Sequence, residues 1–191
     1  EPGSDWHVFR TLQFAWLTTP RLLDLDDQLL EVLDAARGID AAAIVGMLDS
    51  PEVTDAYERD TAESRTAAGT AAELQGKTAT SDGPVRFTAP SLVFERDGVR
   101  QVAGGFQPVE AYDVIVANLD PALARREPPE TPEPLLAAFP DGLTTQEVAQ
   151  LLTVSNDPVD RPAAERALVE LVGEGKARRT PLGDDALWRK A

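Results

Sequence analysis

The sequence contains no cysteine, a single histidine and only three lysines. Without cysteine the chain can form neither a disulfide nor a thiolate zinc site, and it cannot perform thiol chemistry by itself. His7 is the one imidazole, so neither a histidine metal site nor a catalytic triad is expected, and we interpret His7 as a packing residue. No apolar run approaches the roughly 20 residues that span a bilayer, so we predict a soluble, cytoplasmic protein without membrane binding.

Basic side chains are also scarce relative to acidic ones. The chain has 33 aspartates and glutamates against 18 lysines and arginines, which gives a net charge of −15. This charge repels nucleic acid at long range and argues against general polyanion binding. The acidic residues Asp24, Asp26 and Asp27 lack the glycine and spacing of a calcium loop, so they are interpreted as helix caps or solvated surface, and no metal or cofactor is predicted.

Residues 86–94 are the stretch around which we expect the rest of the chain to be organised. Phe87, Leu92 and Phe94 are bulky, and an Asp-Gly pair separates this run from a second one at Val99–Ala103. Two extended runs joined by Asp-Gly predict a β-hairpin. Because proline has no N–H to donate to a strand ladder, Pro90 must begin a strand or lie on an edge.

The stretch from Phe87 to Asp120 resembles the closing half of a thioredoxin fold. Thr88-Ala89-Pro90 precedes the apolar strand and hairpin, and a Gly-Gly-Phe corner then leads into an apolar helix. The pattern is similar to the DsbA-like thiol-disulfide oxidoreductases, which carry a helical insertion before a cis-proline loop. The resemblance implies a substrate-binding site in which the Ala89 backbone pairs with an extended substrate, Thr88 flanks it and Pro90 sets the geometry. It implies no catalytic residue within this cysteine-free chain.

Several consecutive helices are predicted before the hairpin, and the resemblance makes residues 1–69 the helical insertion. Trp6, Phe9 and Trp16 fall near one face of the first helix, so we expect this helix to bury them in a core. The alternative is that Trp6, Phe9, Phe14 and Trp16 line a groove for an apolar substrate. From Gly69 to Pro84, small and polar residues predict a surface loop with one short helical turn.

The strand–helix–strand unit that opens a thioredoxin-like fold is not visible in residues 1–85. A hairpin is marginal alone, and a covering helix needs a broader sheet. We therefore predict that this chain is the C-terminal part of a longer protein, whose remaining part carries a Cys-x-x-Cys at a helix N-terminus. Residues 1–126 would then form a DsbA-like domain without that unit, with the hairpin and final helix at 85–120.

The C-terminal residues are predicted to form a separate module. Residues 127–134 are a proline-rich acidic linker, which is stiff and extended. Residues 135–191 show three helical patterns and two short strands, and they resemble a winged helix. From Pro134 to Ala191 there are seven basic and nine acidic residues, so we favour an interaction module over a DNA reader.

The expected fold class is therefore α/β: a partial thioredoxin-like fold with a helical insertion, followed by a small, mainly α winged-helix-like domain. The first functional hypothesis is a DsbA-family oxidoreductase acting on a protein or small-thiol substrate, with a glutathione-transferase-kappa-like isomerase as a related outcome. The second is a non-catalytic peptide- or protein-binding module. The third, disfavoured by charge, is a winged-helix DNA-binding regulator. Self-association into a homo-oligomer stays open.

Overall fold

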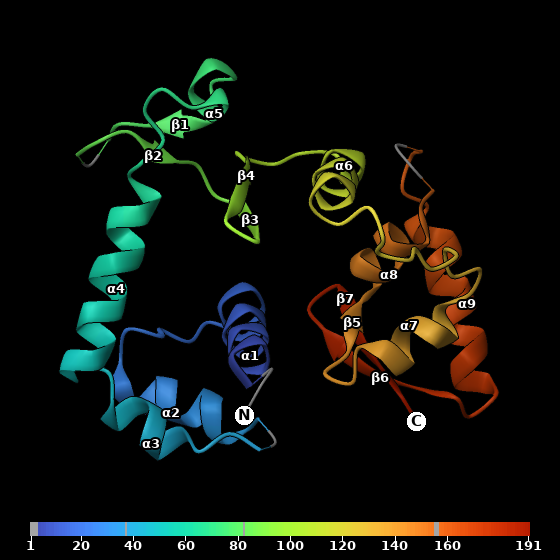
Figure 1. Cartoon of the computed structure of the whole chain (residues 1–191). Coiled ribbons are helices and arrows are strands. Elements are labelled where there is room, and N and C mark those ends of the chain that lie inside the picture. The colour runs from blue at the N-terminus through green and yellow to red at the C-terminus, as the bar shows by residue number, and fades with distance from the viewer. Residues whose placement is uncertain (1–3, 37, 82, 155–156) are drawn as a thin grey trace. The chain divides into compact units, whose positions relative to one another are not determined.

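The computed structural model describes residues 4–36, 38–81, 83–154 and 157–191, and within them the protein is a mixed α/β structure with small antiparallel sheets (Figure 1). The helices are α1 (Ser4–Thr18), α2 (Asp26–Asp34), α3 (Ala41–Gly46), α4 (Pro51–Ser64), α5 (Ala71–Leu74), α6 (Val109–Leu119), α7 (Pro132–Ala138), α8 (Thr145–Leu152) and α9 (Arg161–Gly173). The strands are β1 (Thr78–Ala79), β2 (Arg86–Phe87), β3 (Leu92–Arg96), β4 (Val99–Ala103), β5 (Leu143–Thr144), β6 (Ala177–Leu182) and β7 (Asp185–Lys190). Across these described ranges, no helix is long and apolar enough to cross a membrane.

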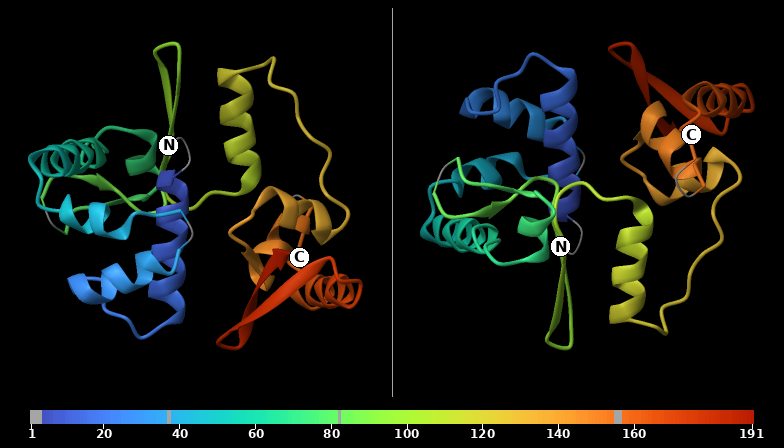
Figure 2. Two further views of the ribbon diagram at one scale, coloured as in Figure 1. Left: turned by 90° about the horizontal axis from the view of Figure 1, so that it is seen from below. Right: turned by 90° about the horizontal axis from the view of Figure 1, so that it is seen from above.

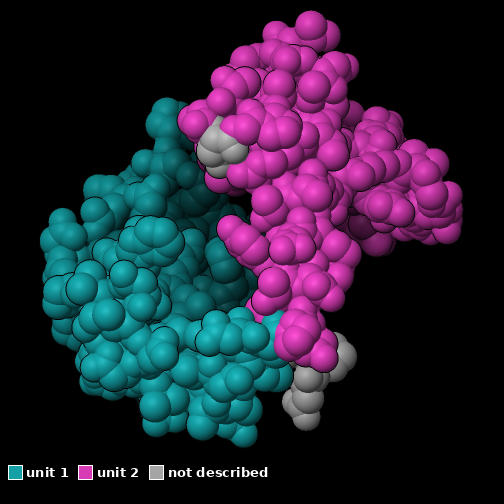
Figure 3. All heavy atoms as spheres, turned by 90° about the vertical axis from the view of Figure 1, so that its left-hand side faces the viewer, with its two compact units in different colours: residues 1–50, 128–191 teal, residues 51–127 magenta. Residues whose placement is uncertain are grey.

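The chain divides into two compact units, which Figure 3 colours separately. One unit combines Glu1–Ser50 with Pro128–Ala191, and the other is Pro51–Glu127. The boundary after Glu127 coincides with the start of the predicted proline-rich linker. The boundary after Ser50 was not predicted, and the assignment of residues 1–126 to one DsbA-like domain stays a prediction.

Helices α1, α2 and α3 form the N-terminal part of the first unit. Asp40 caps α3 as its position predicts, because its Oδ1 accepts the Ala43 N–H at 3.0 Å. Leu33 on α2 is fully buried, and α2 packs against both α1 and α3. These three helices therefore associate through the apolar stripe of α2.

The prediction that α1 buries its aromatic residues is wrong. Trp6 and Phe9 are each 54% exposed and Trp16 is 77% exposed, and the first two stack on each other with ring centroids 5.7 Å apart. The buried side chains of α1 are instead Arg10 and Ala15. The contact of Arg10 with Glu147 decides which face of α1 is buried. The apolar periodicity of the helix cannot predict such a polar contact.

The C-terminal module of the first unit has a compact apolar core. Leu136, Val148, Leu168 and Trp188 are almost completely buried and come from α7, α8, α9 and β7. Strands pair antiparallel in the order β5-β7-β6. The two predicted strands are β6 and β7, and β5 is a third strand that the sequence did not reveal. Figure 2 shows the β6–β7 ribbon, in red, projecting beyond the helices.

The second unit contains the predicted hairpin. Asp97 and Gly98 both have positive φ, 50° and 76°. They form the two-residue turn that joins β3 to β4 in register. Helix α6 packs on β3 and β4, with the rings of Phe94 and Tyr112 6.3 Å apart. The hairpin and this covering helix are confirmed.

The segment before the hairpin is more ordered than predicted. Helix α4 ends at Ser64, and the helical turn predicted between Gly69 and Pro84 appears as α5. Strand β1 pairs with β2, which places Thr78 opposite Phe87. Within the described ranges β1–β2 and β3–β4 are separate two-stranded sheets.

Candidate functional site

The predicted site residues lie in the short loop between β2 and β3. Thr88 is half-buried, whereas Ala89 and Pro90 are exposed. The Ala89–Pro90 peptide bond is cis, the isomer that the DsbA-like resemblance implies. Thr88 therefore faces the protein, and the next two residues face outward.

Hydrogen bonds on both sides hold this loop in place. The N–H and Oγ1 of Thr88 both donate to the carbonyl oxygen of Lys77, at 3.2 and 3.0 Å. On the other side the Ser91 hydroxyl donates to the Thr88 carbonyl and accepts the Gly105 N–H at 2.8 Å. Thr88 is thus tied to the end of α5 through Lys77 and to the end of β4 through Ser91.

Ala89 is the exception in this network. In the part of the chain that the structure describes, neither its N–H nor its carbonyl oxygen has a hydrogen-bond partner. Strand β3, which begins three residues later, pairs only with β4 in that same part of the chain, so its second edge is open. A free donor and acceptor beside an open strand edge can pair with an extended polypeptide.

The Gly104-Gly105 corner supports the loop from behind. A Cβ on Gly104 would lie 2.4 Å from the Cβ of Ala72, and a Cβ on Gly105 would lie 3.1 Å from Thr88 Oγ1. Gly105 also has φ +66°, which side chains other than glycine rarely adopt. Both glycines are required for α5 and the loop to approach β4, which explains the Gly-Gly pair seen in the sequence.

Large apolar side chains around the loop are exposed. Leu92 and Val93 at the start of β3 are 45% and 43% exposed, and Phe106 after the glycine corner is 76% exposed. Val99, at the other end of the hairpin beside its turn, is 54% exposed. A two-stranded hairpin with uncovered apolar residues is marginal in water. Because successive strand side chains point to opposite faces, the hairpin leaves apolar side chains on both faces that further polypeptide can cover.

The structure reveals a second polar cluster, in the first unit, that sequence reasoning missed. The guanidinium of Arg10, which is 8% exposed, donates to both carboxylate oxygens of Glu147 and also to Gln13 at 2.8 Å, and it lies 4.2 Å from the centroid of the Phe14 ring. Burial opposes ionisation of Glu147, but hydrogen bonds from Arg10 and Thr144 outweigh it and hold the pKa of that carboxyl below its ordinary value. Both terminal nitrogens of Arg10 donate to Glu147, so this cluster joins α1 to α8.

His7 belongs to the same junction. Its Nδ1 lies 2.8 Å from Asp141 Oδ1, and its side chain is 25% exposed. This is the packing position expected of His7. Over the described ranges, no group of three or more histidine, aspartate or glutamate side chains is arranged to hold a metal ion.

The chain was compared with models of known protein families and with curated proteins. No family model matches it, and no curated protein matches it significantly.

Proposed function

We propose that this chain is the substrate-binding portion of a DsbA-like thiol-disulfide oxidoreductase, with Thr88, Ala89 and Pro90 as its substrate-binding loop. The observation that carries the proposal is the exposed Ala89 backbone, unpaired within the described ranges, beside the open edge of β3. An extended substrate would accept the Ala89 N–H and donate to its carbonyl oxygen.

The proposal divides the chemistry between two sets of residues. In disulfide exchange a thiolate attacks one sulfur of a disulfide, a mixed disulfide forms, and the other sulfur leaves as a thiolate. This sequence contains no cysteine, so the attacking thiolate belongs to residues outside it. What this chain contributes is the strand pairing that holds the substrate and the exposed apolar side chains of Leu92, Val93 and Phe106.

A second candidate function rests on the same geometry. The open edge of β3 would equally serve a non-catalytic protein that binds extended peptides. The two candidates differ in one property, which is whether the complete protein carries a reactive pair of thiols. We also propose a winged-helix-like arrangement for residues 135–191, supported by the element order α7, β5, α8, α9, β6, β7 and by the projecting β6–β7 ribbon (Figure 2).

The test uses the protein expressed from its complete reading frame in its own host. Alkylation followed by intact-mass measurement counts its thiols, and a disulfide-exchange assay with an unfolded peptide substrate gives kcat/KM. Ala89→Pro removes the N–H, whereas Ala89→Ser keeps it and serves as the matched control. We expect kcat/KM to fall about fivefold to tenfold in Ala89→Pro, the equivalent of one backbone hydrogen bond, and to change little in Ala89→Ser.

Two outcomes would redirect the proposal. A protein without reactive thiols that still binds extended peptides through Ala89 would be the non-catalytic binding module. Equal activity and equal peptide binding in Ala89→Pro and Ala89→Ser would remove Ala89 from the site altogether.

A further inference from the structure

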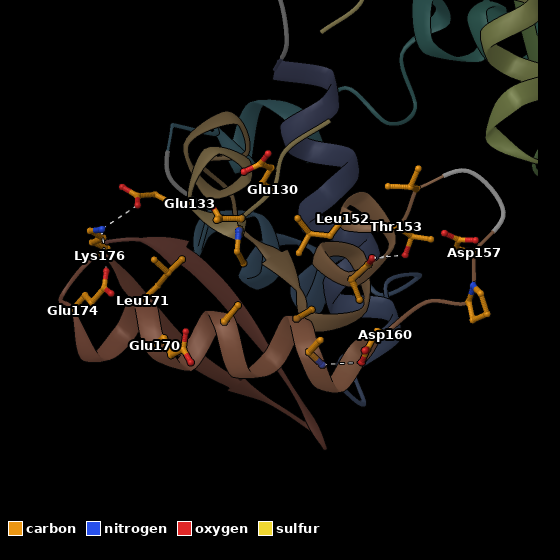
Figure 4. Close-up of a pocket in the computed structure, with 18 residues that line it drawn as sticks. Glu130, Glu133, Leu152, Thr153, Asp157, Asp160, Glu170, Leu171, Glu174 and Lys176 are labelled. Carbon is orange, nitrogen blue, oxygen red and sulfur yellow. Dashed lines mark hydrogen bonds and ion pairs between the residues drawn. The ribbon is translucent and has the colours of Figure 1, made fainter. Parts of the chain in front are cut away.

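The C-terminal module contains a groove lined by α7, α8 and α9 and the segments next to them, with a volume of about 680 Å³ (Figure 4). We call it the acidic groove, because its lining includes the carboxylates of Glu130, Glu133, Asp160, Glu170 and Glu174. Its apolar lining consists of small or aliphatic side chains: Ala149, Leu152, Ala163, Ala164, Ala167 and Leu171. The groove thus combines an apolar floor with an acidic rim.

The rim already binds one ammonium group. Lys176 is the single cation among the described lining residues, and its Nζ lies 2.9 Å from Glu174 Oε2 and 3.2 Å from Glu133 Oε2 (Figure 4). The hydrogen bonds that Lys176 donates to Glu174 and then to Glu133 raise the pKa of its ammonium group. A lysine side chain therefore fits between the carboxylates of this rim.

Other rim carboxylates have no such partner. Within the described ranges, Glu130 and Glu170 form no ion pair, although both line the groove. Like charges held near one another favour a ligand that brings positive charge. The rim therefore has carboxylates that Lys176 does not neutralise and that a basic ligand could bind.

The floor favours a partner with apolar side chains. Ala163 and Ala167 lie one helical turn apart on α9 and are half-buried, and Leu152 on α8 is half-buried as well. Small alanine side chains allow close approach of another backbone, and an amphipathic helix can place its apolar face in such a groove. A free metal ion or polyamine would make no use of this floor.

We propose that the acidic groove binds a basic amphipathic helix of another protein, with its apolar face on the alanine floor and its lysines or arginines on the acidic rim. Nucleic acid is the wrong partner for this surface, since phosphates would meet Glu130, Glu170 and the other rim carboxylates. The proposal is independent of the function assigned to Ala89.

The probe is a fluorescein-labelled peptide of about 14 residues, four helical turns, composed of leucine and lysine with leucines on one face. A scrambled peptide of the same composition has the same charge but no apolar face. Anisotropy titration of the full chain at physiological salt is expected to show at least about tenfold tighter binding of the amphipathic peptide, because salt screens the long-range field of the acidic protein.

Charge-reversal variants distinguish the contribution of the rim carboxylates to peptide binding from that of the net negative charge of the chain. Glu170→Lys and Glu165→Lys both lie on α9 and change the net charge equally, but only Glu170 lines the groove. We expect Glu170→Lys to weaken binding about tenfold and Glu165→Lys to weaken it by less than about twofold.

Filling the floor provides a test that leaves the charge unchanged. Ala167→Trp is expected to block the peptide, whereas Ala137→Trp, at an exposed position of α7 outside the lining, is expected to bind normally. Circular dichroism melts confirm that each variant is folded.

Equal binding of the scrambled peptide would show general attraction to an acidic protein and would overturn the proposal. Equal losses in Glu170→Lys and Glu165→Lys would do the same, as would tight binding of duplex DNA to the groove or no peptide binding at micromolar concentrations.

Discussion

Arg10 and Glu147 lie 137 residues apart in the sequence and form a bidentate ion pair, with Nη1 2.6 Å from Oε1 and Nη2 3.0 Å from Oε2. Glu147 Oε2 also accepts the Thr144 N–H at 2.9 Å, which closes the capping box of α8. One carboxylate thus serves both the local cap and the junction with α1. Its charge state therefore affects the stability of the first unit.

The first prediction concerns Glu147→Gln, which keeps the cap but removes the charge. The variant is expected to be less stable at pH 7 by about 1 to 2 kcal/mol, because hydrogen bonds to a charged partner are lost. The folded pKa of Glu147 is depressed, so its contribution is complete above the ordinary value of 4.5 and disappears as pH falls through the folded pKa. Denaturant unfolding at pH 7 and at progressively lower pH should therefore show the difference shrinking in acid.

Glu165→Gln, at an exposed position of α9, is the control and should change the unfolding free energy by less than about 0.5 kcal/mol. Equal stability of Glu147→Gln and the unmodified chain at pH 7 would show that the ion pair contributes nothing.

The second prediction concerns the buried hydrogen bond inside the C-terminal module. Trp188 Nε1 donates to Thr145 Oγ1 at 2.8 Å, and both side chains are almost fully buried. Thr145→Val leaves the indole N–H without an acceptor and should cost about 1 to 3 kcal/mol, whereas Thr145→Ser keeps the hydroxyl and should cost less. Thermal melts followed by tryptophan fluorescence measure both, and a Thr145→Val variant as stable as Thr145→Ser would contradict this account.

The third prediction concerns the glycine corner behind the candidate loop. Gly104→Ala places a Cβ 2.4 Å from the Cβ of Ala72, so α5 must shift, at a cost of about 1 to 3 kcal/mol. Gly46→Ala on α3 meets nothing within 4 Å and should be neutral or stabilising by up to about 1 kcal/mol. Chemical denaturation compares the two, and similar effects of both substitutions would mean that the corner is not closely packed.

The fourth prediction concerns Ser91, whose hydroxyl joins the Thr88 carbonyl to the Gly105 N–H. Ser91→Ala removes this bridge, so the Gly105 amide should exchange with solvent about tenfold faster, which corresponds to one lost hydrogen bond. Ser81→Ala, at an exposed position before β2, serves as the control and should leave that amide unchanged. Hydrogen exchange followed by NMR reads the effect, and unchanged Gly105 exchange in Ser91→Ala would contradict the bridge.

Local sequence determined much of the secondary structure. The Asp97-Gly98 turn occurs where the sequence predicts it, and the Thr144–Glu147 capping box and the Asp160 cap of α9 are equally local features. Each of these features depends on groups within four residues of one another, so the sequence contains all the information required. The mixed α/β class follows from the same local patterns.

The candidate site was only partly accessible to such reasoning. Thr88, Ala89 and Pro90 were singled out by a resemblance, but the sequence could not show that the Ala89 backbone lacks an internal partner among the described residues. That property depends on Thr88 binding Lys77, 11 residues away, and on Ser91 binding both Thr88 and Gly105, of which Gly105 lies 14 residues away.

By itself, then, the sequence determined the helices, the hairpin turns and an acidic chain without thiols. Tertiary structure alone decided that α1 turns Arg10 inward while Trp16 is 77% exposed, and that β1 pairs with β2 and β5 with β7. The physical reason is that an apolar stripe indicates only which side chains would gain from burial. Which face of the helix is buried depends on the side chains that other parts of the chain place against it. For Arg10 that partner was a carboxylate 137 residues away.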